Sequence, residues 1–339
     1  MRLPMVNRPP SGSFPDPVLI TGAAGFIGTA LARSLTSLGV RVRALVRPDR
    51  DASALESMGV TVVRGDATEQ ADLCQAAAGC GTVFHLAAAR GPRKLSRSTY
   101  LELNARGAEA AGQACLTVGA IRLVFTSAAS VCAGTRAESR NEATPLRPNS
   151  SYRESKVRAE HILQGLHRQR GLPVVITRLP SVLGPGAIDW RARFRAVREG
   201  RIRFLPRGGV THPGDVADMV DGLRLAAQVP GIEGECFVLA SAEPVPVRGL
   251  YAAMAEALGV PFSPRELPAA PFLAYLALAD TVYRATGLAL PHWYTCEAQA
   301  DRTIYDIGKA RRVLGFVPRV SVRESVTRTA RWLTERQLL

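Results

Sequence analysis

Short apolar segments alternate with longer amphipathic segments between residues 16 and 180, and this alternation constrains the fold more than any other feature of the chain. Strands that alternate with helices of about ten residues require right-handed crossovers, and these produce a parallel sheet. The sequence therefore predicts an α/β fold with a doubly wound parallel sheet. The expected strands are 17–21, 40–46, 60–64, 82–86, 121–127 and 173–178, and the expected helices are 26–38, 51–58, 69–78, 98–118 and 151–170.

Several expected strands are continuously apolar at their centres, among them Val18-Leu19-Ile20 and Leu123-Val124-Phe125, which indicates a sheet covered on both faces. We predict that residues 16–180 form a dinucleotide-binding domain, completed by returning segments of the C-terminal half. Residues 181–339 are expected to form mainly a smaller substrate-binding lobe over the carboxyl ends of the strands. Residues 1–15 are expected to be a disordered tail. Further helices are expected at 214–228, 246–258, 306–314 and 321–336.

A glycine-rich turn joins the first expected strand to the first expected helix. Its glycines are spaced for a dinucleotide: the first allows a sharp turn, the second lets the backbone approach the phosphates, and the third lets helix pack on strand. The helix N-terminus then offers N–H groups to the pyrophosphate. A tight turn without a ligand is the alternative, but the position of the turn in the α/β pattern favours a cofactor. The expected contacts are Gly22, Ala24, Gly25, Phe26, Ile27 and Gly28.

The end of the second expected strand bears on which dinucleotide is used. NAD-dependent enzymes usually place an acid there, whereas an arginine accommodates the 2′-phosphate of NADP. Val46 stands where the acid would be and Arg47 follows it, so NADP(H) is favoured, while Asp49 keeps NAD(H) open. Asp66, followed by Ala67, is expected either to accept a hydrogen bond from the adenine amino group or to cap the next helix.

Tyr152 and Lys156 lie four residues apart on the expected helix 151–170 and therefore share a face. A free phenol has a pKa of about 10, and a neighbouring ammonium lowers it toward neutrality. The lysine can also hold the nicotinamide ribose, and it is one of only three lysines in the chain. We therefore expect Tyr152 and Lys156 to be catalytic residues and cofactor contacts of a nicotinamide-dependent enzyme.

With the glycine turn and the Tyr-x-x-x-Lys motif together, the chain resembles the extended short-chain dehydrogenase/reductases over nearly its whole length. Four further segments carry the resemblance: 85–88 (HLAA), 103–107 (LNARG), 126–131 (TSAASV) and 178–186 (RLPSVLGPG). The resemblance implies a Rossmann-type sheet. It also implies that the cofactor is bordered by Leu86, Ala87, Ala88, Asn104, Thr126, Leu179, Pro180 and Val182.

Two C-terminal stretches, 291–295 (PHWYT) and 306–317 (DIGKARRVLGFV), resemble the 3β-hydroxysteroid dehydrogenase branch, which includes bacterial reductases of 2-alkyl-3-oxo acids. Sugar-nucleotide epimerases of the same family usually carry a phosphate-binding arginine in a segment that corresponds to residues 208–212 (GGVTH). Glycine stands in its place here, which speaks against a nucleotide-sugar substrate, although Arg207 is adjacent.

The chain departs from the family at the catalytic loop. The Ser/Thr that hydrogen-bonds the substrate oxygen in the family falls on Ala128, and alanine has no donor. Either Ser127 or Ser130 is expected to substitute, or a substrate group or water supplies the hydrogen bond. Ser127 is favoured because it is adjacent, although neighbouring residues of a strand point to opposite faces. An altered site that does not perform simple ketone reduction is the other interpretation.

The predicted function is that of an NAD(P)-dependent oxidoreductase that reduces a ketone, or oxidises the secondary alcohol, of a largely apolar small molecule. Candidate substrates are a β-keto acid, a steroid-like ring or a specialised metabolite. In reduction Tyr152 donates the proton, while Lys156 tunes Tyr152 and binds ribose. Two alternatives stay open: a nucleotide-sugar epimerase or dehydratase with tightly bound NAD, and a non-catalytic dinucleotide sensor.

The composition of the chain limits which binding partners and which cellular location are expected. The net charge is +14, but the arginines are scattered along the chain, so no nucleic-acid partner is expected. The six cysteines show no metal-site spacing, so reduced thiols, no metal and a cytoplasmic location are expected. The apolar run 271–290 predicts a core-packing helix, a cover for the substrate entrance, or a peripheral membrane contact through 267–295. A homodimer through helices 98–118 and 151–170 is expected from the family.

Overall fold

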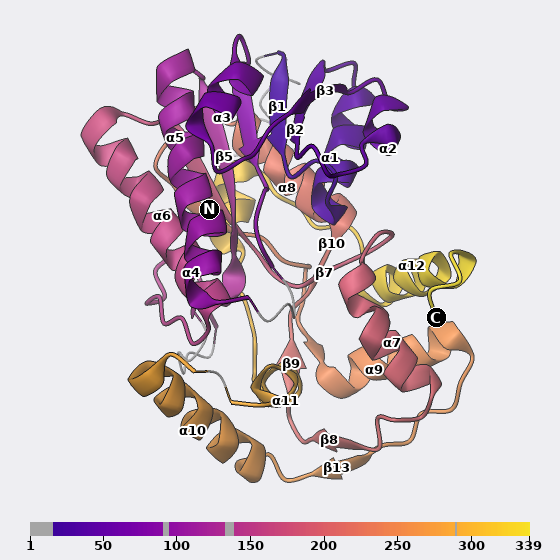
Figure 1. Cartoon of the computed structure of the whole chain (residues 1–339). Helices are drawn as coiled ribbons and strands as arrows, with labels where there is room; N and C mark the ends of the chain where they lie inside the picture. Colours follow the sequence, from indigo (N-terminus) through magenta and orange to yellow (C-terminus); the bar gives the residue numbers. More distant parts are fainter. Residues whose placement is uncertain (1–15, 91–94, 133–138, 289) are drawn as a thin grey trace, which may run out of the picture.

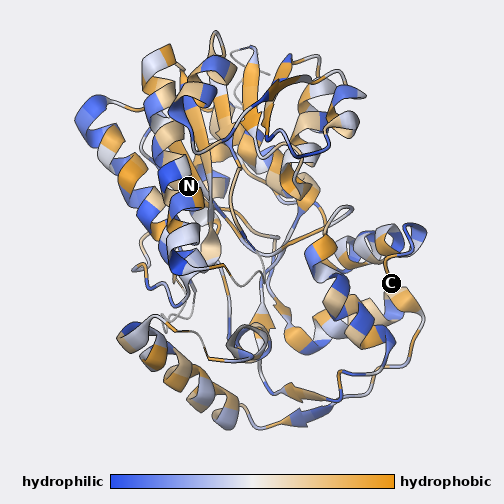
Figure 2. Ribbon diagram, viewed as in Figure 1, coloured by the Kyte–Doolittle hydropathy of each residue, from blue (hydrophilic) through white to orange (hydrophobic). Residues whose placement is uncertain are grey.

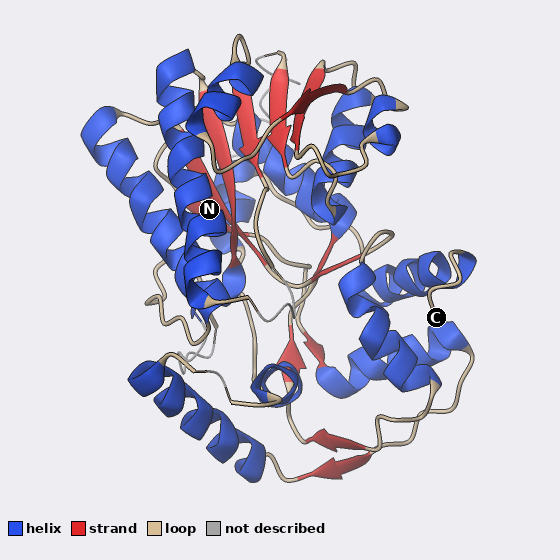
Figure 3. Cartoon of the chain, viewed as in Figure 1, coloured by secondary structure: helices blue, strands red, loops and turns tan. Residues whose placement is uncertain are grey.

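The computed structural model describes residues 16–90, 95–132, 139–288 and 290–339, and its centre is a seven-stranded parallel sheet (Figures 1 and 3). The strand order is β11-β6-β5-β4-β1-β2-β3, so the order reverses between β1 and β4. All six strands expected from the sequence are confirmed. The strands are β1 (Val18–Thr21), β2 (Val42–Val46), β3 (Thr61–Arg64), β4 (Thr82–His85), β5 (Arg122–Ala128), β6 (Val174–Leu179) and β11 (Cys236–Val238).

Strand β11 was not expected, and it comes from the C-terminal half of the chain. It pairs in parallel with β6, with Cys236 opposite Ile176, and extends the sheet by one strand. The chain therefore returns from the lobe to the nucleotide-binding sheet.

Helices cover both faces of this sheet, as the apolar strands predict. Val18 and Ile20 of β1 pack into the apolar core that includes residues of α1 and α8, whereas Leu19 packs into the opposite core with residues of α3, α5 and α6. The alternation of side chains along a strand explains this division. The helices are α1 (Phe26–Thr36), α2 (Ser53–Glu56), α3 (Gln70–Ala77), α4 (Arg97–Tyr100), α5 (Gly107–Val118), α6 (Ser151–Arg170) and α8 (Val216–Gln228).

The helix expected at 98–118 is continuous from 97 to 118 but changes its type in the middle. Between α4 and α5 the chain forms a π-helical segment, η1 (Leu101–Arg106), which contains the buried Asn104. Such widened turns occur mostly at functional sites, because they re-aim one side chain without breaking the helix. Helical periodicity alone does not reveal this change.

Most of the remaining elements form a lobe at the carboxyl ends of the strands, below the sheet in Figure 1, whereas η4 packs with α8 into the apolar core beside the sheet. The apolar core of the lobe includes Phe194, Met254 and Val326, from α7, α9 and α12. The expected helices 214–228, 246–258 and 321–336 are confirmed, and 306–314 is helical over 308–314, mostly as η4, whereas α7 and α11 were not expected. The elements are β7 (Val182–Leu183), η3 (Ile188–Trp190), α7 (Arg191–Arg198), β8 (Phe204–Pro206), β9 (Val210–Thr211), β10 (Gly214–Asp215), β12 (Val245–Pro246), α9 (Val247–Leu258), β13 (Arg265–Leu267), α10 (Ala270–Thr286), α11 (Trp293–Ala300), η4 (Ala310–Leu314) and α12 (Val322–Glu335).

Helix α10 lies at the outer edge of the lobe and carries many apolar residues (Figure 2). Only Ala279 and Tyr283 of α10 are buried, while Leu273 is 47% exposed and Leu278 is 55% exposed. The interpretation of 271–290 as a plain core-packing helix is therefore wrong. No helix in the described parts of the chain is long and apolar enough to cross a bilayer.

Candidate active site

The glycine-rich turn follows β1 at the point where the strand order reverses. Gly22 has φ of +72°, and a Cβ there would lie 2.7 Å from the backbone nitrogen of Ala87. A Cβ at Gly28 would collide with the carbonyl oxygen of Gly22, so α1 can approach β1 only with glycine at this position. Gly25 begins α1 without a side-chain cap, and Ala24 and Gly25 are exposed. The turn thus offers open backbone at a helix N-terminus, which fits a pyrophosphate.

Strand β4 brings a second segment to the same edge of the sheet. The Thr21 hydroxyl lies 3.0 Å from Nδ1 of His85 and accepts a hydrogen bond from the Ala87 backbone N–H at 3.2 Å. Burial, followed by the positive charge of Lys156, lowers the pKa of His85 to about 3. His85 is therefore a neutral part of the scaffold, and Leu86 and Ala87 lie beside the glycine turn, where the sequence predicts a cofactor contact.

Asn104 fixes the segment that follows β4 to the helix that carries Tyr152. Its Oδ1 accepts from the Ala89 backbone N–H at 2.7 Å, and its Nδ2 donates to the Ala89 carbonyl at 3.0 Å and to the Ser155 hydroxyl at 2.8 Å. The Ser155 hydroxyl in turn donates to the Tyr152 carbonyl at 2.7 Å. The Asn104 amide thus holds two parts of the site together, and a direct contact of Asn104 with the cofactor stays a prediction.

Helix α6 places Tyr152 and Lys156 at the carboxyl end of β5. The Lys156 amine is buried, donates to the Thr126 carbonyl at 2.9 Å, and lies 4.9 Å from the centre of the Phe125 ring. Burial lowers the pKa of Lys156 to about 8, although the negative charge of Glu160 opposes part of that effect. Tyr152 is half-buried, and its ring meets the edge of Tyr100 at 6.1 Å.

Contacts between side chains connect this pair to the glycine turn. The Phe125 ring, beneath the Lys156 amine, stacks on His85 at 5.9 Å, and His85 bonds to Thr21 at the start of the turn. The structure therefore brings together the two motifs that the sequence separates by more than a hundred residues.

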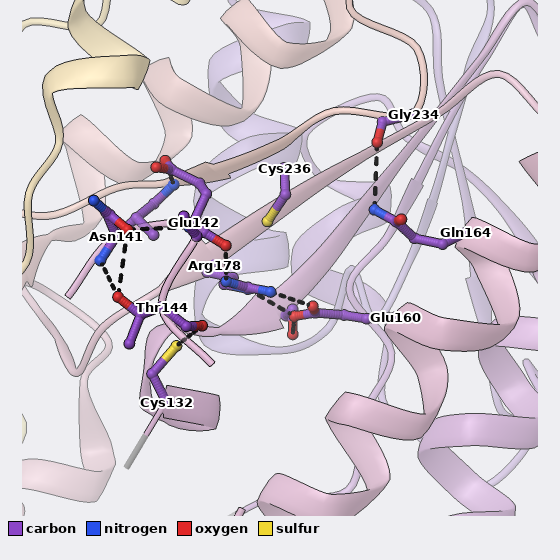
Figure 4. A network of polar contacts seen from close by, with 12 residues as sticks. Cys132, Asn141, Glu142, Thr144, Glu160, Gln164, Arg178, Gly234 and Cys236 are labelled. Atoms are coloured by element: carbon purple, nitrogen blue, oxygen red, sulfur yellow. Dashed lines mark hydrogen bonds and ion pairs between the residues drawn. The ribbon is translucent and has the colours of Figure 1, made fainter. Parts of the chain in front are cut away.

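The structure of the loop after β5 contradicts the expectation that Ser127 replaces the donor missing at Ala128. The Ser127 hydroxyl donates to Oε1 of Glu160 at 2.6 Å. Glu160 is paired with Arg178 at 2.7 Å (Figure 4). Ser127 therefore points toward α6 and cannot at the same time donate to a substrate oxygen, so the preference for Ser127 is wrong. The physical reason is the strand alternation: Ser127 and Ala128 face opposite ways. Ser130, in the 3₁₀ turn η2 (Ala129–Cys132), instead lines the cavity described below.

The expected adenosine end of the site is basic and exposed. Nε of Arg47 lies 3.6 Å from Oδ1 of Asp49, and Arg64 donates to the carbonyl oxygens of Arg47 and Arg50. Asp66 accepts from the backbone N–H and the hydroxyl of Thr68, both at 2.8 Å. Asp66 thus caps the turn before α3, and its contact with adenine stays a prediction, as does the contact of Ala67.

The segment after β6 closes over the glycine turn from the other side. Leu179 and Val182 are buried, and a Cβ at Gly186 would lie 2.8 Å from the Phe26 ring. The indole N–H of Trp190 donates to the Val182 carbonyl at 2.8 Å, which anchors the segment to η3. The residues expected to cover the nicotinamide therefore lie against the residues expected to hold the pyrophosphate.

A cavity of about 90 Å³ lies between this edge of the sheet and the lobe. Arg153, next to Tyr152, is paired with Glu297 of α11 at 2.6 Å, and Arg140 is paired with Asp301 at 2.8 Å. A third arginine, Arg193, stacks on Trp190 at 4.6 Å. Sequence analysis missed these charged groups, because they are isolated in the sequence and no motif connects them. The lining is Ser130, Arg140, Arg153, Ser181, Trp190, Arg193, Val210, Thr211, His212, Leu250, Tyr251, Glu297, Ala298, Asp301, Thr303 and Tyr305.

The cavity is thus more polar than a largely apolar substrate would suggest. His212 donates through Nε2 to the Ser241 carbonyl at 2.9 Å and accepts at Nδ1 from the Tyr305 backbone N–H at 3.0 Å. Burial also lowers the pKa of His212, so this ring is neutral. Among the described residues no group of three or more His, Cys, Asp or Glu side chains has the arrangement of a metal site, and the six cysteines are free.

Comparison with known proteins identifies a family and relatives that are named as reductases. Residues 18–239 match the model of the NAD-dependent epimerase/dehydratase family. A 2-alkyl-3-oxoalkanoate reductase from Stenotrophomonas maltophilia is 28% identical over 336 residues, which cover 92% of this chain and 97% of the relative. A 4-hydroxy-2-methyl-3-oxo-4-farnesyl-3,4-dihydroquinoline-1-oxide ketoreductase from Stigmatella aurantiaca is also 28% identical, covering 89% of this chain and 92% of the relative.

Solved structures show the same fold. The crystal structure of gox2253 superposes with a TM-score of 0.82 at 25% identity and covers 96% of this chain and 99% of that chain. A dTDP-glucose 4,6-dehydratase from Streptomyces venezuelae, solved with NAD bound, superposes with a TM-score of 0.76 at 24% identity and covers 94% of this chain and 97% of that chain.

Proposed function

The chain belongs to the NAD-dependent epimerase/dehydratase family, whose members use a nicotinamide dinucleotide, and we propose that it is an NADP(H)-preferring reductase of a ketone. The observation that carries this proposal is the placement of Tyr152 and Lys156 at the carboxyl end of β5, in contact through Phe125 and His85 with the glycine turn. A Tyr–Lys pair can move a proton to or from a carbonyl oxygen, which is what carbonyl reduction and alcohol oxidation need.

The protein's own groups have separate tasks in this proposal. The dinucleotide, when bound, supplies or accepts the hydride. Tyr152 donates the proton to the substrate oxygen, and the Lys156 ammonium stabilises the phenolate that remains and binds ribose. Ser130 replaces the missing donor at Ala128, because Ser130 lines the cavity while the Ser127 hydroxyl is bonded to Glu160.

The preference for NADP(H) rests on the end of β2. The side chain of Arg47 is 45% exposed, and the Arg64 guanidinium donates to the Arg47 carbonyl, so two cationic side chains are available near the expected position of a 2′-phosphate. No acid occupies position 46, where ribose hydroxyls would be bound in an NAD-dependent enzyme.

The substrate proposed is a β-keto acid with an apolar chain. Two relatives are named as a 2-alkyl-3-oxoalkanoate reductase and a ketoreductase, which supports a ketone over a nucleotide sugar. Arginine in the cavity lining suits a carboxylate, and apolar lining residues such as Trp190, Leu250 and Tyr251 suit the chain.

A coupled measurement of cofactor use tests the proposal. Purified protein is mixed with NADPH or NADH and a panel of 3-oxo acids, their methyl esters and neutral ketones, and the loss of reduced cofactor is followed. We expect turnover of 3-oxo acids with NADPH. Redox-neutral conversion of a nucleotide sugar by protein that co-purifies with NAD would instead identify an epimerase or dehydratase. Cofactor binding without turnover of any carbonyl would identify a sensor.

A further inference from the structure

Beneath the Tyr152–Lys156 pair, three polar side chains form a buried bridge that the roles assigned above do not use. Glu160 of α6 accepts from the Ser127 hydroxyl at 2.6 Å and from Nε of Arg178 at 3.0 Å on one oxygen, and from Nη2 of Arg178 at 2.7 Å on the other. Ser127 and Arg178 are direct partners in the β5–β6 register. The bridge therefore joins the catalytic helix to both strands that end at the site.

This bridge is almost closed to solvent. Glu160 is 3% exposed and Arg178 is 5% exposed. A buried ion pair with its hydrogen bonds satisfied holds one geometry, because displacing either partner leaves an uncompensated charge in a medium of low polarity. The bridge thus restrains how far α6 can slide or rotate against β5 and β6.

The bridge is also coupled to the Lys156 amine. Tyr152, Lys156 and Glu160 succeed one another at intervals of four residues on one face of α6. On the strand side, Ser127 follows Thr126, whose carbonyl accepts the Lys156 ammonium at 2.9 Å. The bridge therefore holds both partners of the Lys156–Thr126 hydrogen bond: Glu160 lies on the helix that carries Lys156, and Ser127 follows Thr126 on the strand.

We infer that Glu160 is a positioning residue of this enzyme: through its bonds to Ser127 and Arg178 it seats α6 on β5 and β6, and so fixes the Lys156 amine against the Thr126 carbonyl. The inference rests on the proposed roles of Tyr152 and Lys156. It assigns a task to a carboxylate that touches neither cofactor nor substrate.

The charged and titratable groups around the Lys156 amine support this role. Tyr152 and Glu160 lie on α6, His85 ends β4, Arg90 lies in the loop after β4, and Arg178 of β6 is paired with Glu160. Burial lowers the pKa of Lys156 and the cation of Arg90 adds to that effect, whereas the anion of Glu160 raises it. His85 is neutral and contributes no negative charge. Removal of the Glu160 charge should therefore let Lys156 lose its proton at a lower pH.

The test measures cofactor binding in the Tyr152→Phe variant, which has no phenol whose ionisation could mask that of Lys156. NADPH affinity of Tyr152→Phe and of Tyr152→Phe/Glu160→Gln is measured by fluorescence over a pH series. We expect affinity to fall as Lys156 deprotonates, and the midpoint of that fall to move down by about one pH unit when Glu160 is neutralised. The matched control is Tyr152→Phe/Glu154→Gln on the same helix: the half-buried carboxylate of Glu154 is paired with Arg97, and its loss should leave the midpoint unchanged.

A second variant separates charge from folding. Glu160→Gln leaves Arg178 without a charged partner. Glu160→Gln/Arg178→Met in the same Tyr152→Phe background removes both charges, so it should restore the melting temperature and leave a smaller shift of the midpoint than Glu160→Gln alone. A midpoint equal to that of Tyr152→Phe in both variants would overturn the inference. If Tyr152→Phe binds no NADPH at any pH, the inference and the proposed cofactor both fail. A shifted midpoint in an enzyme that reduces no ketone would contradict only the proposed reaction.

Discussion

At the scale of single residues, the site depends on which side chains are free to act and which are already bonded. Ser127 is committed to Glu160, and the Lys156 amine is committed to the Thr126 carbonyl. Ser130 lines the cavity and takes no part in the Glu160 bridge. The loss of the hydroxyl at Ala128 thus leaves Ser130 as the candidate donor on this loop.

Tyr152→Phe should lower ketone turnover by about 10²–10⁴-fold, because the ring still packs against Tyr100 but the proton donor is gone. Cofactor affinity should change little. The two quantities are measured by steady-state turnover and by NADPH fluorescence titration. Retention of more than about a tenth of wild-type turnover would remove Tyr152 from the general-acid role.

Ser130→Ala should affect catalysis, whereas Ser127→Ala should affect stability. Loss of the Ser130 hydroxyl should lower kcat/KM by about tenfold, as expected for one hydrogen bond worth about 1–2 kcal/mol, with little change in stability. Loss of the Ser127 hydroxyl should lower the melting temperature, because it removes a buried bond to Glu160. Comparison of kcat/KM and thermal unfolding for both variants checks this, and equal kinetic losses would argue against the assignment.

Arg193→Leu should discriminate between acids and esters. If the guanidinium over Trp190 recognises a carboxylate, the variant should raise KM for a 3-oxo acid by about tenfold or more and leave KM for the corresponding methyl ester nearly unchanged. Arg191→Leu, an exposed neighbour on α7, is the matched control. Parallel increases for acid and ester would indicate a packing role for Arg193.

Reductive turnover should decline as the pH rises through about 8, the value to which burial lowers the pKa of Lys156. Below that pH the ammonium is present and stabilises the phenolate form of Tyr152, and above it this positive charge is lost. A pH profile of kcat/KM with NADPH measures the decline. A profile that is flat to well above pH 8 would contradict the proposed task of Lys156.

At the scale of elements, two helices depart from simple patterns for functional reasons. The π-helical η1 directs Asn104 at the loop after β4 and at Ser155 on α6. Helix α10 leaves Leu273 and Leu278 exposed, yet its Tyr283 donates to Glu154 of α6 at 3.2 Å. The outer helix of the lobe is therefore attached to the first turn of the catalytic helix.

We predict that α10 is the part of the surface that contacts anionic membranes. Its exposed leucines follow β13, and β13 pairs with β8, where Arg203 and Arg207 are exposed. Leu273→Glu/Leu278→Glu should abolish co-sedimentation with phosphatidylglycerol vesicles and leave thermal stability and NADPH affinity unchanged. Wild-type protein that stays in the supernatant with these vesicles would refute the prediction.

At the scale of the whole molecule, ion pairs connect α6 and the loop before it to the lobe beside the cavity. Arg153 next to Tyr152 bonds to Glu297 of α11 through two nitrogen atoms, at 2.9 and 2.6 Å, and Arg140 bonds to Asp301. These pairs set the position of the lobe relative to the reacting groups, so the shape of the cavity depends on contacts between distant parts of the chain.

Glu297→Ala should therefore lower the free energy of unfolding by about 3 kcal/mol, because it leaves the buried Arg153 without its carboxylate. It should also raise KM for the ketone substrate. Urea unfolding and steady-state kinetics measure the two effects. Glu266→Ala, which removes a carboxylate from exposed arginines, is the control and should change stability by less than about 1 kcal/mol. Equal losses in the two variants would argue against a special role for the Arg153–Glu297 pair.

The sequence by itself determined the sheet, the glycine turn and the shared face of Tyr152 and Lys156, because apolar periodicity, a positive φ and a spacing of four residues are local properties. Only the tertiary structure decided the rest. The seventh strand, the commitment of Ser127 to Glu160, and the arginines of the cavity join residues that lie 33 to 161 positions apart, as in the Ser127–Glu160 and Arg140–Asp301 bonds. An isolated charge in a sequence looks the same whether it will meet water or a buried partner. Its role is decided when the chain packs, because burial is what makes an unpaired charge unfavourable.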